Sequence, residues 1–374
     1  MSAGKTEQEQ LNRLREQIDK IDTDIQKLIS ERAGCAQQVA AVKMEYNPQA
    51  EPVFYRPERE AQVLREVMLR NQGPLADEAI ARIFREIMST CLALEQPMQV
   101  AFLGPEGTFT QAAALKHFGR SVICKPLASI NEIFREVESG SANYGVVPVE
   151  NSTEGMVNPT LDSFINSELQ ICGEVELRIH HHLLTKDPVP LENICRVYSH
   201  EQSLAQCRQW LNANLPHAER VSVSSNAEAA SRAAKTPCSE EGGMVAAIAG
   251  DMAAQTYQLG KQFEQIEDQP DNTTRFLVIG KQVVAPSGRD KTSIIVATRN
   301  RPGALYHLLE PFQRKGISLT RIETRPTRHS TWAYAFFIDF EGHCQEKKIR
   351  EILDFLEEDV IDLHMLGSYP MAVL

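Results

Sequence analysis

The sequence predicts a multidomain protein with an all-α segment, then an α/β domain, then a small domain of the order βαββαβ. Up to about Gln96 the apolar residues follow a helical period, and no strand signal occurs. After Pro97 short apolar runs alternate with helical stretches, as is typical of α/β domains. Beyond a linker at 285–290, strands and helices follow in the ferredoxin-like order. We place the domains at 1–96, 98–284 and 291–370 of the 374 residues.

A long amphipathic helix opens the chain. Its apolar stripe repeats every three and four residues, through Leu11, Leu14, Ile18, Ile21, Ile25 and Leu28. Nothing interrupts this helix before Asn47-Pro48, so it spans roughly 35 residues. Shorter helices are expected from Pro57 to about Asn71 and from Asp77 to Glu95. A segment dominated by one long helix buries little core alone, so we expect a helical dimer.

The later segments are expected to contain short strands and helices. In the α/β segment the expected strands are Gln99 to Leu103, Tyr144 to Val149, Glu174 to Leu184, Arg196 to Tyr198 and Thr274 to Ile279. Its expected helices are Thr110 to Phe118, Ile130 to Ser139, Thr160 to Ser167, Gln202 to Asn212, Asn226 to Lys235 and Gly250 to Tyr257. In the last segment, strands are expected at Lys291 to Arg299, Leu319 to Thr324, Trp332 to Phe340 and Ile361 to Leu366, and helices at Ala304 to Lys315 and Glu346 to Glu358.

Composition narrows the class of protein. Hydrophobic residues make up 42% of the chain, and no apolar run of about 18 residues occurs, so no membrane span is expected. The N-terminus is polar and the cysteines are scattered, which favours a cytoplasmic protein. The net charge of −11 argues against nucleic acid or an acidic membrane as a partner, although local arginines can still bind a small anion.

No metal or cofactor is expected. The eight cysteines form no CxxC pair, and each is better explained as a small buried or surface side chain than as a reactive thiol. They are Cys35, Cys91, Cys124, Cys172, Cys195, Cys207, Cys238 and Cys344. Neighbouring residues of a strand point to opposite faces, so His180, His181 and His182 cannot all bind one ion, and we expect structural roles for them.

An arginine falls on the apolar seam of the first helix. Heptads counted from Leu11 lead through Ile18 and Ile25 to Arg32. A charge there is costly unless it is paired, although an arginine at the end of a stripe can also extend to solvent. The surrounding segments resemble the all-helical chorismate mutases: Leu14-Arg15-Glu16-Gln17-Ile18-Asp19, Glu31-Arg32, Val42-Lys43 and Arg59-Glu60.

That resemblance implies a site for chorismate, a dicarboxylate whose rearrangement to prephenate needs no nucleophile. Arg15 and Arg32 are expected to bind the carboxylates, because a guanidinium group contacts both oxygens of a carboxylate. Lys43 is expected to donate to the ether oxygen. Glu60 is expected to hold the substrate hydroxyl, with Arg59 nearby.

Two positions depart from the mutase pattern. Glu95 stands where many members have glutamine, as a second donor to the ether oxygen. A glutamate donates only when protonated, so its pKa must be raised, and mutase activity is expected to fall above neutral pH. Arg56-Pro57 stands where relatives often have an aspartate, which leaves hydroxyl recognition to Glu60.

Helix geometry predicts a shared mutase site. Arg32 and Lys43 lie ~16 Å apart along the helix axis, a gap that two long side chains and a small dianion close. Arg15 and Lys43 lie ~42 Å apart on the same helix, which no small ligand bridges. A site that uses both must take Arg15 from a second chain, so we hypothesise an intertwined dimer.

Three motifs of the α/β segment lie at strand ends or turns, where α/β proteins bind ligands. They are Gly104-Pro105-Glu106-Gly107-Thr108-Phe109-Thr110, Pro148-Val149-Glu150-Asn151-Ser152-Thr153-Glu154-Gly155 and Asn272-Thr273-Thr274-Arg275-Phe276. The first lacks the spacing of nucleotide sites, and each alone is also explained as a helix-capping turn. Together they resemble prephenate dehydratases, which implies two lobes like those of periplasmic binding proteins and a site in the cleft.

The dehydratase resemblance also implies residue roles. Prephenate loses its ring hydroxyl and its ring carboxylate, and Thr274 is expected to protonate the departing hydroxyl. Arg275 is expected to hold a carboxylate. The other residues expected at the substrate are Asn151, Ser199, Gln206 and Phe276.

The last segment contains two short motifs, one at the start of its first helix and one in its second strand. Arg301-Pro302-Gly303-Ala304-Leu305 and Ile322-Glu323-Thr324-Arg325-Pro326 resemble the paired motifs of an ACT domain, which implies a phenylalanine site between neighbouring chains. The residues concerned are Gly303, Ala304, Leu305, Glu323, Thr324, Arg325 and Pro326. Gly303 lets the backbone approach the ligand and opens a helix, whose N-terminus attracts a carboxylate. Thr324 replaces the usual serine and keeps its hydroxyl.

Taken in order, the three resemblances imply a bifunctional chorismate mutase/prephenate dehydratase of phenylalanine synthesis. We expect L-phenylalanine to inhibit it by favouring a different state, and a homodimer or larger homo-oligomer. One alternative is a monofunctional dehydratase that the helical segment only dimerises, against which Arg15, Arg32, Lys43 and Glu60 argue. The other is a non-enzymatic sensor with two lobes and an ACT domain, which does not need the Thr274-Arg275-Phe276 set.

Overall fold

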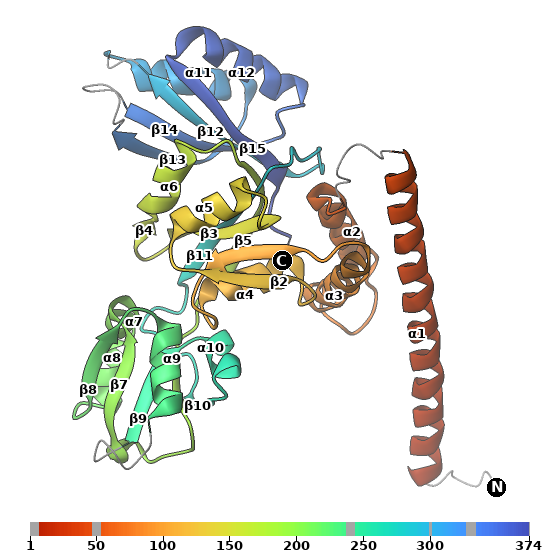
Figure 1. Ribbon diagram of the computed structural model, residues 1–374, viewed down its shortest axis with the longest axis vertical. Helices are drawn as coiled ribbons and strands as arrows, with labels where there is room; N and C mark the ends of the chain where they lie inside the picture. The colour runs from red at the N-terminus through yellow and green to blue at the C-terminus, as the bar shows by residue number, and fades with distance from the viewer. Residues whose placement is uncertain (1–6, 47–53, 237–243, 299–300, 327–333, 374) are drawn as a thin grey trace, which may run out of the picture.

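The computed structural model describes most of the chain (Figure 1). The described residues are 7–46, 54–236, 244–298, 301–326 and 334–373. Asn47-Pro48, Cys238, Arg299 and Trp332, which the sequence analysis used, lie outside them, and Pro326 is described by its backbone alone. Among the described residues, no helix is both long enough and apolar enough to cross a bilayer.

The N-terminal segment consists of helices α1 (Glu7–Tyr46), α2 (Pro57–Arg70) and α3 (Asp77–Glu95), as predicted. Proline at the first position of α2 presets the helical φ angle. Helix α1 contacts α3 but otherwise stands away from the molecule (Figure 1). Its apolar stripe is uncovered: Leu14 and Ile18 are 55% and 56% exposed, and Leu28 is 63% exposed.

The α/β segment folds into two lobes. Lobe 1 has the sheet order β2-β1-β3-β11-β5, and the short β4 pairs with β3. Its strands are β1 (Gln99–Leu103), β2 (Ile123–Leu127), β3 (Tyr144–Asn151), β4 (Gly155–Met156), β5 (Gln170–Arg178) and β11 (Thr273–Gly280). Its helices are α4 (Phe109–Phe118), α5 (Ile130–Glu138) and α6 (Asn158–Phe164).

Lobe 2 has the sheet order β10-β6-β9-β7-β8. Its strands are β6 (His182–Thr185), β7 (Ile194–His200), β8 (Glu219–Val223), β9 (Met244–Ala249) and β10 (Gly260–Phe263). Its helices are α7 (Glu201–Gln206), α8 (Arg208–Asn214), α9 (Asn226–Lys235) and α10 (Asp251–Thr256), with a 3-10 turn at Leu191–Asn193. The chain crosses between the lobes twice, after β5 and again before β11.

The sequence prediction was wrong for one strand, for one helix and for several strands that it missed. The strand expected from Glu174 to Leu184 is two strands in different sheets, because the chain leaves lobe 1 after Arg178 and enters lobe 2 at His182. The helix expected from Gln202 to Asn212 is divided at Cys207 into α7 and α8. Strands β2, β4, β8, β9 and β10 were not predicted. In β9 the cause is its alanine content, since alanine has low strand propensity.

The C-terminal segment has the predicted element order of strand, helix, strand, strand, helix, strand. These elements are β12 (Asp290–Thr298), α11 (Ala304–Lys315), β13 (Leu319–Pro326), β14 (Tyr334–Glu341), α12 (Lys347–Asp359) and β15 (Asp362–Pro370). The sheet order is β13-β14-β12-β15, with antiparallel neighbours. Helices α11 and α12 cover one sheet face, with Leu308, Phe312 and Ile352 in a core beside Ile294 and Ile338.

The other face of this sheet packs on lobe 1. Phe337, Leu366 and Tyr369 belong to the same buried cluster as Ile171 and Leu277 of lobe 1. At Gly367 the two backbones approach so closely that a Cβ would lie 2.6 Å from the carbonyl oxygen of Ile171. Its φ of +143° is also rarely open to other residues. The C-terminal domain is therefore held against the α/β domain by a buried contact.

Candidate active sites and regulatory domain

A cleft between the lobes collects most residues that the sequence assigned to the dehydratase. Thr274, Asn151, Gln206 and Phe276 line it, together with the first motif around Thr108. The cleft holds about 1070 Å³, which is at the upper end of ligand pockets at roughly 300–1,000 Å³. A cleft of this volume is open and leaves room for the two lobes to move closer together.

Thr274 and Asn151 form the centre of the cleft. They are register partners on β11 and β3, and the Asn151 Nδ2 donates to Thr274 Oγ1 at 2.8 Å. The Asn151 Oδ1 accepts from the backbone N–H groups of Thr153 and Glu154, so the amide orientation is fixed. Because Thr274 Oγ1 is an acceptor from Asn151, its own hydrogen is left to point toward a ligand.

Gln206, the last residue of α7 in lobe 2, connects the two lobes. Its Oε1 accepts from His181 Nε2 at 2.9 Å and from Asn272 Nδ2 at 3.1 Å. Its Nε2 donates to Glu154 Oε1 at 3.3 Å. Burial raises the pKa of Glu154, although His200 and the bond from Gln206 act in the opposite direction. Gln206 is therefore bonded to both crossings and to the loop that follows Asn151.

The prediction that Ser199 lines the cleft is wrong. Its side chain is fully buried, and its hydroxyl contacts Asn226 Oδ1 at 3.0 Å and the carbonyl of Ile248 at 2.8 Å. Asn226, at the start of α9, is the residue that reaches the cleft, and its Nδ2 also donates to Ser203. The sequence analysis missed Asn226. Its place next to the N-cap Ser225 of a helix that follows a strand is the signal that points to it.

The prediction that Arg275 holds a substrate carboxylate is also wrong for this structure. Arg275 is buried and donates to Glu174 at 2.8 Å, to Asp339 at 2.6 Å and to the Tyr369 hydroxyl at 3.0 Å. Asp339 and Tyr369 belong to the C-terminal domain, and Lys291 also pairs with Glu174. Arg275 faces away from the cleft because neighbouring residues of a strand point to opposite faces, and Thr274 faces the cleft.

A second ion pair joins the C-terminal domain to strand β3 of the cleft. Arg321 of β13 pairs with Glu150, the residue before Asn151. Burial alone would raise the pKa of Asp339, but the charge of Arg275 and the Ser293 hydroxyl outweigh burial and hold that pKa below its ordinary value. The residues next to Thr274 and Asn151 are thus both bonded to the C-terminal domain.

The mutase residues are only partly brought together. Arg32 and Lys43 of α1 lie close enough to Glu95 of α3 to influence its pKa. Burial raises that pKa, and the two positive charges act against the increase. Lys43 Nζ also lies 5.4 Å from the centre of the Phe54 ring. One chain therefore brings together the cations Arg32 and Lys43 and the Glu95 carboxyl, whose pKa is raised.

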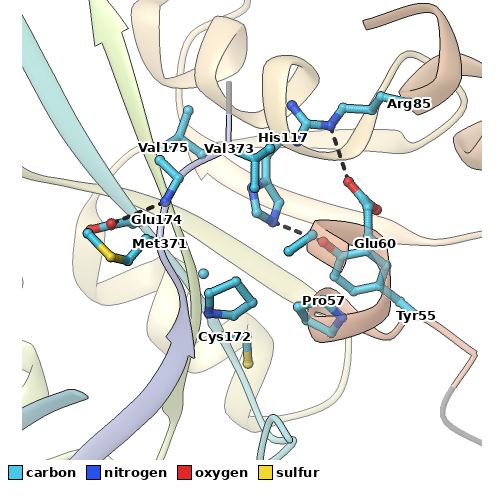
Figure 2. A pocket seen from close by; sticks show the side chains of 14 residues that line it. Tyr55, Pro57, Glu60, Arg85, His117, Cys172, Glu174, Val175, Met371 and Val373 are labelled. Carbon is cyan, nitrogen blue, oxygen red and sulfur yellow. Dashed lines mark hydrogen bonds and ion pairs between the residues drawn. The ribbon is translucent and has the colours of Figure 1, made fainter. Parts of the chain in front are cut away.

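The remaining mutase residues lie elsewhere. Arg15 is exposed near the far end of α1, and Arg59 is exposed on α2. Glu60 lies in a small pocket where the helical segment meets lobe 1, and it accepts from Arg85 at 3.1 Å (Figure 2). This structure does not bring Glu60 to the group of Arg32 and Glu95, so its contact with the substrate hydroxyl stays a prediction.

The pocket in Figure 2 is a junction of domains. His117 of α4 shares a hydrogen bond of 3.0 Å with the hydroxyl of Tyr55, and burial lowers the pKa of His117 to about 3. Arg85 also donates to the carbonyl of Lys116 at 2.7 Å. The backbone of Ala372 donates to Glu174. The helical segment, lobe 1 and the C-terminal tail thus meet around buried polar contacts.

The predicted ACT residues lie at two neighbouring edges of the C-terminal domain. Gly303 has a φ of +81° and precedes α11, followed by the half-buried Ala304 and the exposed Leu305. On β13, Thr324 is exposed and Glu323 is half-buried. The other residues of that motif are Arg325, which pairs with Asp162 of α6 at 2.7 Å, and Pro326 at the end of the strand.

The three neighbouring histidines have separate partners. His180 contacts Glu267 at 2.7 Å, His181 contacts Gln206, and His182 accepts from the backbone of Gln265 at 3.1 Å. Within the described ranges, no group of three or more His, Cys, Asp or Glu side chains is arranged to hold a metal ion.

Comparison with known proteins agrees with this arrangement. The chorismate mutase type II family model matches residues 14–96, the prephenate dehydratase model 100–283 and the ACT domain model 292–358. A bifunctional chorismate mutase/prephenate dehydratase of Pseudomonas aeruginosa is 61% identical, over 98% of this chain and 100% of its own length. This chain belongs to the bifunctional chorismate mutase/prephenate dehydratases.

Further relatives support membership of the bifunctional family. The bifunctional protein of Neisseria gonorrhoeae is 49% identical over 96% of this chain and 97% of its own length. The crystal structure of the prephenate dehydratase of Arthrobacter aurescens, in complex with L-Phe, has a TM-score of 0.67 and 34% identity, covering 73% of this chain and 90% of that one. The chain is an enzyme with both activities, which excludes the monofunctional and the non-enzymatic alternatives.

Proposed function

We propose that the chain converts chorismate to prephenate in its helical domain and prephenate to phenylpyruvate in the cleft, with feedback inhibition by phenylalanine. The observation that carries this proposal is the pair of Thr274 and Asn151 on adjacent strands of the cleft. We further propose the domain bounds 1–96, 98–284 and 291–370 and a cytoplasmic location. We also propose that both reactions proceed without a metal ion or cofactor.

In the cleft, Thr274 is the proton donor to the departing ring hydroxyl. The bond from Asn151 occupies a lone pair of Thr274 Oγ1, and a hydroxyl that accepts a hydrogen bond becomes a better donor. Loss of the ring carboxylate as carbon dioxide supplies the electron pair that expels the protonated hydroxyl as water. The ring becomes aromatic, so the protein mainly has to position one donor and hold the substrate.

In the helical domain, Arg32 binds a chorismate carboxylate, while Lys43 and protonated Glu95 donate to the ether oxygen. The raised pKa of Glu95 supports the donor role, because only the protonated carboxyl has a hydrogen to donate. Charge develops on the ether oxygen in the transition state, and the fixed donors stabilise it there. Glu60 holds the substrate hydroxyl, with Arg59 nearby, after a rearrangement of the helices.

We propose that Arg15 enters this site from a second copy of the chain. The uncovered apolar stripe of α1 supports this proposal, since Leu14, Ile18 and Leu28 are more than half exposed. A soluble helix rarely leaves such a stripe in water, and a second α1 offers the same spacing. The dimer would thus complete both the core of the helical domain and its active site.

Phenylalanine inhibits, in this proposal, by binding at Gly303, Leu305 and Thr324 between neighbouring C-terminal domains. The complex of the Arthrobacter aurescens dehydratase with L-Phe supports an amino-acid ligand for this architecture. The ion pairs of Arg275 and Arg321 connect the C-terminal domain to the residues beside the catalytic pair. A shift of that domain would therefore act on the cleft.

The test is a time course of purified protein with chorismate, with and without phenylalanine. We expect prephenate to appear first, then phenylpyruvate, and phenylalanine to slow the second step. Prephenate that accumulates without phenylpyruvate would remove the dehydratase proposal. Turnover that stays unchanged in saturating phenylalanine would remove the regulatory one.

A further inference from the structure

His181 occupies the first crossing between the lobes, between β5 and β6. Its side chain is 2% exposed and lies in the wall of the cleft. The ring is held edge to face by Phe109 at 5.7 Å, and the backbone N–H donates to Glu267 at 2.9 Å. Both the backbone and the ring of His181 are therefore fixed where the lobes join.

The hydrogen bonds around Gln206 define which His181 nitrogen carries the proton. Gln206 Oε1 faces Asn272 Nδ2, and Gln206 Nε2 faces the Glu154 carboxylate. Turning the amide over would set two amide donors against each other and an oxygen against a carboxylate. The His181 nitrogen that meets Oε1 must therefore be an N–H donor, which is Nε2.

One continuous chain of hydrogen bonds leads from this nitrogen to the reacting hydroxyl. His181 Nε2 donates to Gln206 Oε1 at 2.9 Å, and Gln206 Nε2 donates to Glu154 Oε1 at 3.3 Å. The backbone of Glu154 donates to Asn151 Oδ1 at 3.2 Å. Asn151 Nδ2 then donates to Thr274 Oγ1 at 2.8 Å. In each of these hydrogen bonds the donor and the acceptor are fixed, so the orientation of the Gln206 amide determines that of the Asn151 amide.

We propose that His181 is a positioning residue of the dehydratase, which orients Gln206 and, through Glu154 and Asn151, the hydroxyl of Thr274. A histidine that only fills a core has both ring nitrogens hydrogen-bonded or packed away from the site. His181 instead lines the cleft, and its Nδ1 has no hydrogen-bond partner in the described part of the chain. Burial lowers the pKa of His181, which keeps the ring neutral and Nδ1 unprotonated. This inference rests on the proposed dehydration through Thr274.

The test compares kcat and KM for prephenate between the full-length enzyme and two His181 variants. In His181→Gln the longer amide places an N–H donor near the position of Nε2. In His181→Asn the shorter amide reaches only the position of Nδ1, so Gln206 Oε1 loses that donor. We expect His181→Asn to lower kcat about ten- to a hundredfold with KM within about threefold, and His181→Gln to recover kcat to within about fivefold of wild type.

A double variant and a control complete the test. The double variant His181→Asn/Gln206→Ala is expected to lose no more kcat than Gln206→Ala alone, because His181 acts through Gln206. His217→Gln changes an exposed histidine of the same lobe and is expected to leave kcat unchanged. Additive losses, equal losses in both His181 variants, or an effect confined to the thermal unfolding midpoint would each overturn the proposal.

Thr274→Ala, measured in the same assay, separates this inference from the proposed function. If Thr274→Ala keeps its dehydratase rate, the proposed function fails whatever His181 does. If Thr274→Ala is inactive and the His181 variants do not follow the expected pattern, only the role of His181 fails.

Discussion

The two catalytic centres of this enzyme differ in how much of each is present in one chain. Of the residues proposed for the dehydratase, Thr274 and Asn151 share a hydrogen bond, and Gln206 is linked to Asn151 through Glu154, all within one chain. The mutase has Arg32 and Lys43 beside Glu95, whereas Arg15 lies ~42 Å from Lys43 along α1. In the function proposed above, dehydration therefore uses two lobes of one chain, whereas the rearrangement needs a second chain.

The strongest change that we expect is the loss of one activity without the other. Thr274→Ala removes the proposed proton donor, so dehydratase kcat is expected to fall about 10³-fold or more, within the range of general acid catalysis. Mutase kcat is expected to stay within about twofold of wild type, because Thr274 lies outside the helical domain. Separate assays with chorismate and with prephenate measure the two rates.

The control for Thr274→Ala is Thr273→Ala, the neighbouring position on β11 that points to the other face of the sheet. It is expected to keep dehydratase kcat. Equal losses in both variants would mean that the strand, rather than the hydroxyl of Thr274, is what the reaction requires.

Arg275→Gln tests whether the dehydratase centre depends on the C-terminal domain. Removal of the guanidinium leaves the buried carboxylates of Glu174 and Asp339 with fewer partners, which is expected to cost about 3–5 kcal/mol of unfolding free energy. Urea unfolding measures this cost. We also expect weaker inhibition by phenylalanine, since the variant breaks a connection between the two domains.

The matched control is Arg178→Gln on the adjacent strand β5, which removes an exposed ion pair with Asp271. Exposed pairs contribute about 0–1 kcal/mol, so little change is expected. If Arg275→Gln were as stable as Arg178→Gln, and its inhibition by phenylalanine were unchanged, the buried network would have neither a structural nor a regulatory role.

A mixing experiment tests the shared mutase site. Arg15→Ala and Lys43→Ala are each expected to lower mutase kcat about a hundredfold or more when purified alone. Unfolding and refolding the two variants together is expected to restore about a quarter of wild-type activity, because half of the dimers are mixed and each mixed dimer has one intact site. Activity that stays at the level of the single variants would place Arg15 outside the site.

The mildest change that we expect concerns pH. Glu95 donates only when protonated, and burial raises its pKa, with Lys43 and Arg32 opposing the increase. Mutase kcat is therefore expected to be highest below the pKa of Glu95 and to fall as pH rises through it. Glu95→Gln keeps a donor at every pH and is expected to show a flatter profile. Identical profiles would contradict a role for the Glu95 proton.

The helical domain was predicted almost to the residue because its signals are local. Pro57 begins α2, and the spacing of apolar residues defines α1 and α3. The interior of the α/β domain was harder, since β9 is rich in alanine and its strand character comes from burial between neighbouring strands. The strand propensity of the residues of β9 does not reveal which strands will lie on either side of it.

The part of the cleft formed by β11 was predictable, because neighbouring residues of a strand point to opposite faces. Thr274 and Phe276 share one face of β11 and line the cleft, so Arg275 between them had to point away. The motif resemblance assigned all three to the substrate, and alternation would have corrected that assignment. Asn226 had a local signal in its place next to the N-cap Ser225, whereas the position of His181 was out of reach because it depends on how the lobes fold toward one another.

Gly367 has a consequence for how tolerant the interface is to change. A side chain there would strike the backbone of Ile171, which has no flexible end that can move aside. In a saturation mutagenesis library scored for growth without phenylalanine, position 367 is therefore expected to accept glycine and little else. The exposed Leu305 of the same domain is expected to accept many residues in that screen. Selection for growth in the presence of a toxic phenylalanine analogue is expected to enrich substitutions at Leu305 that weaken inhibition.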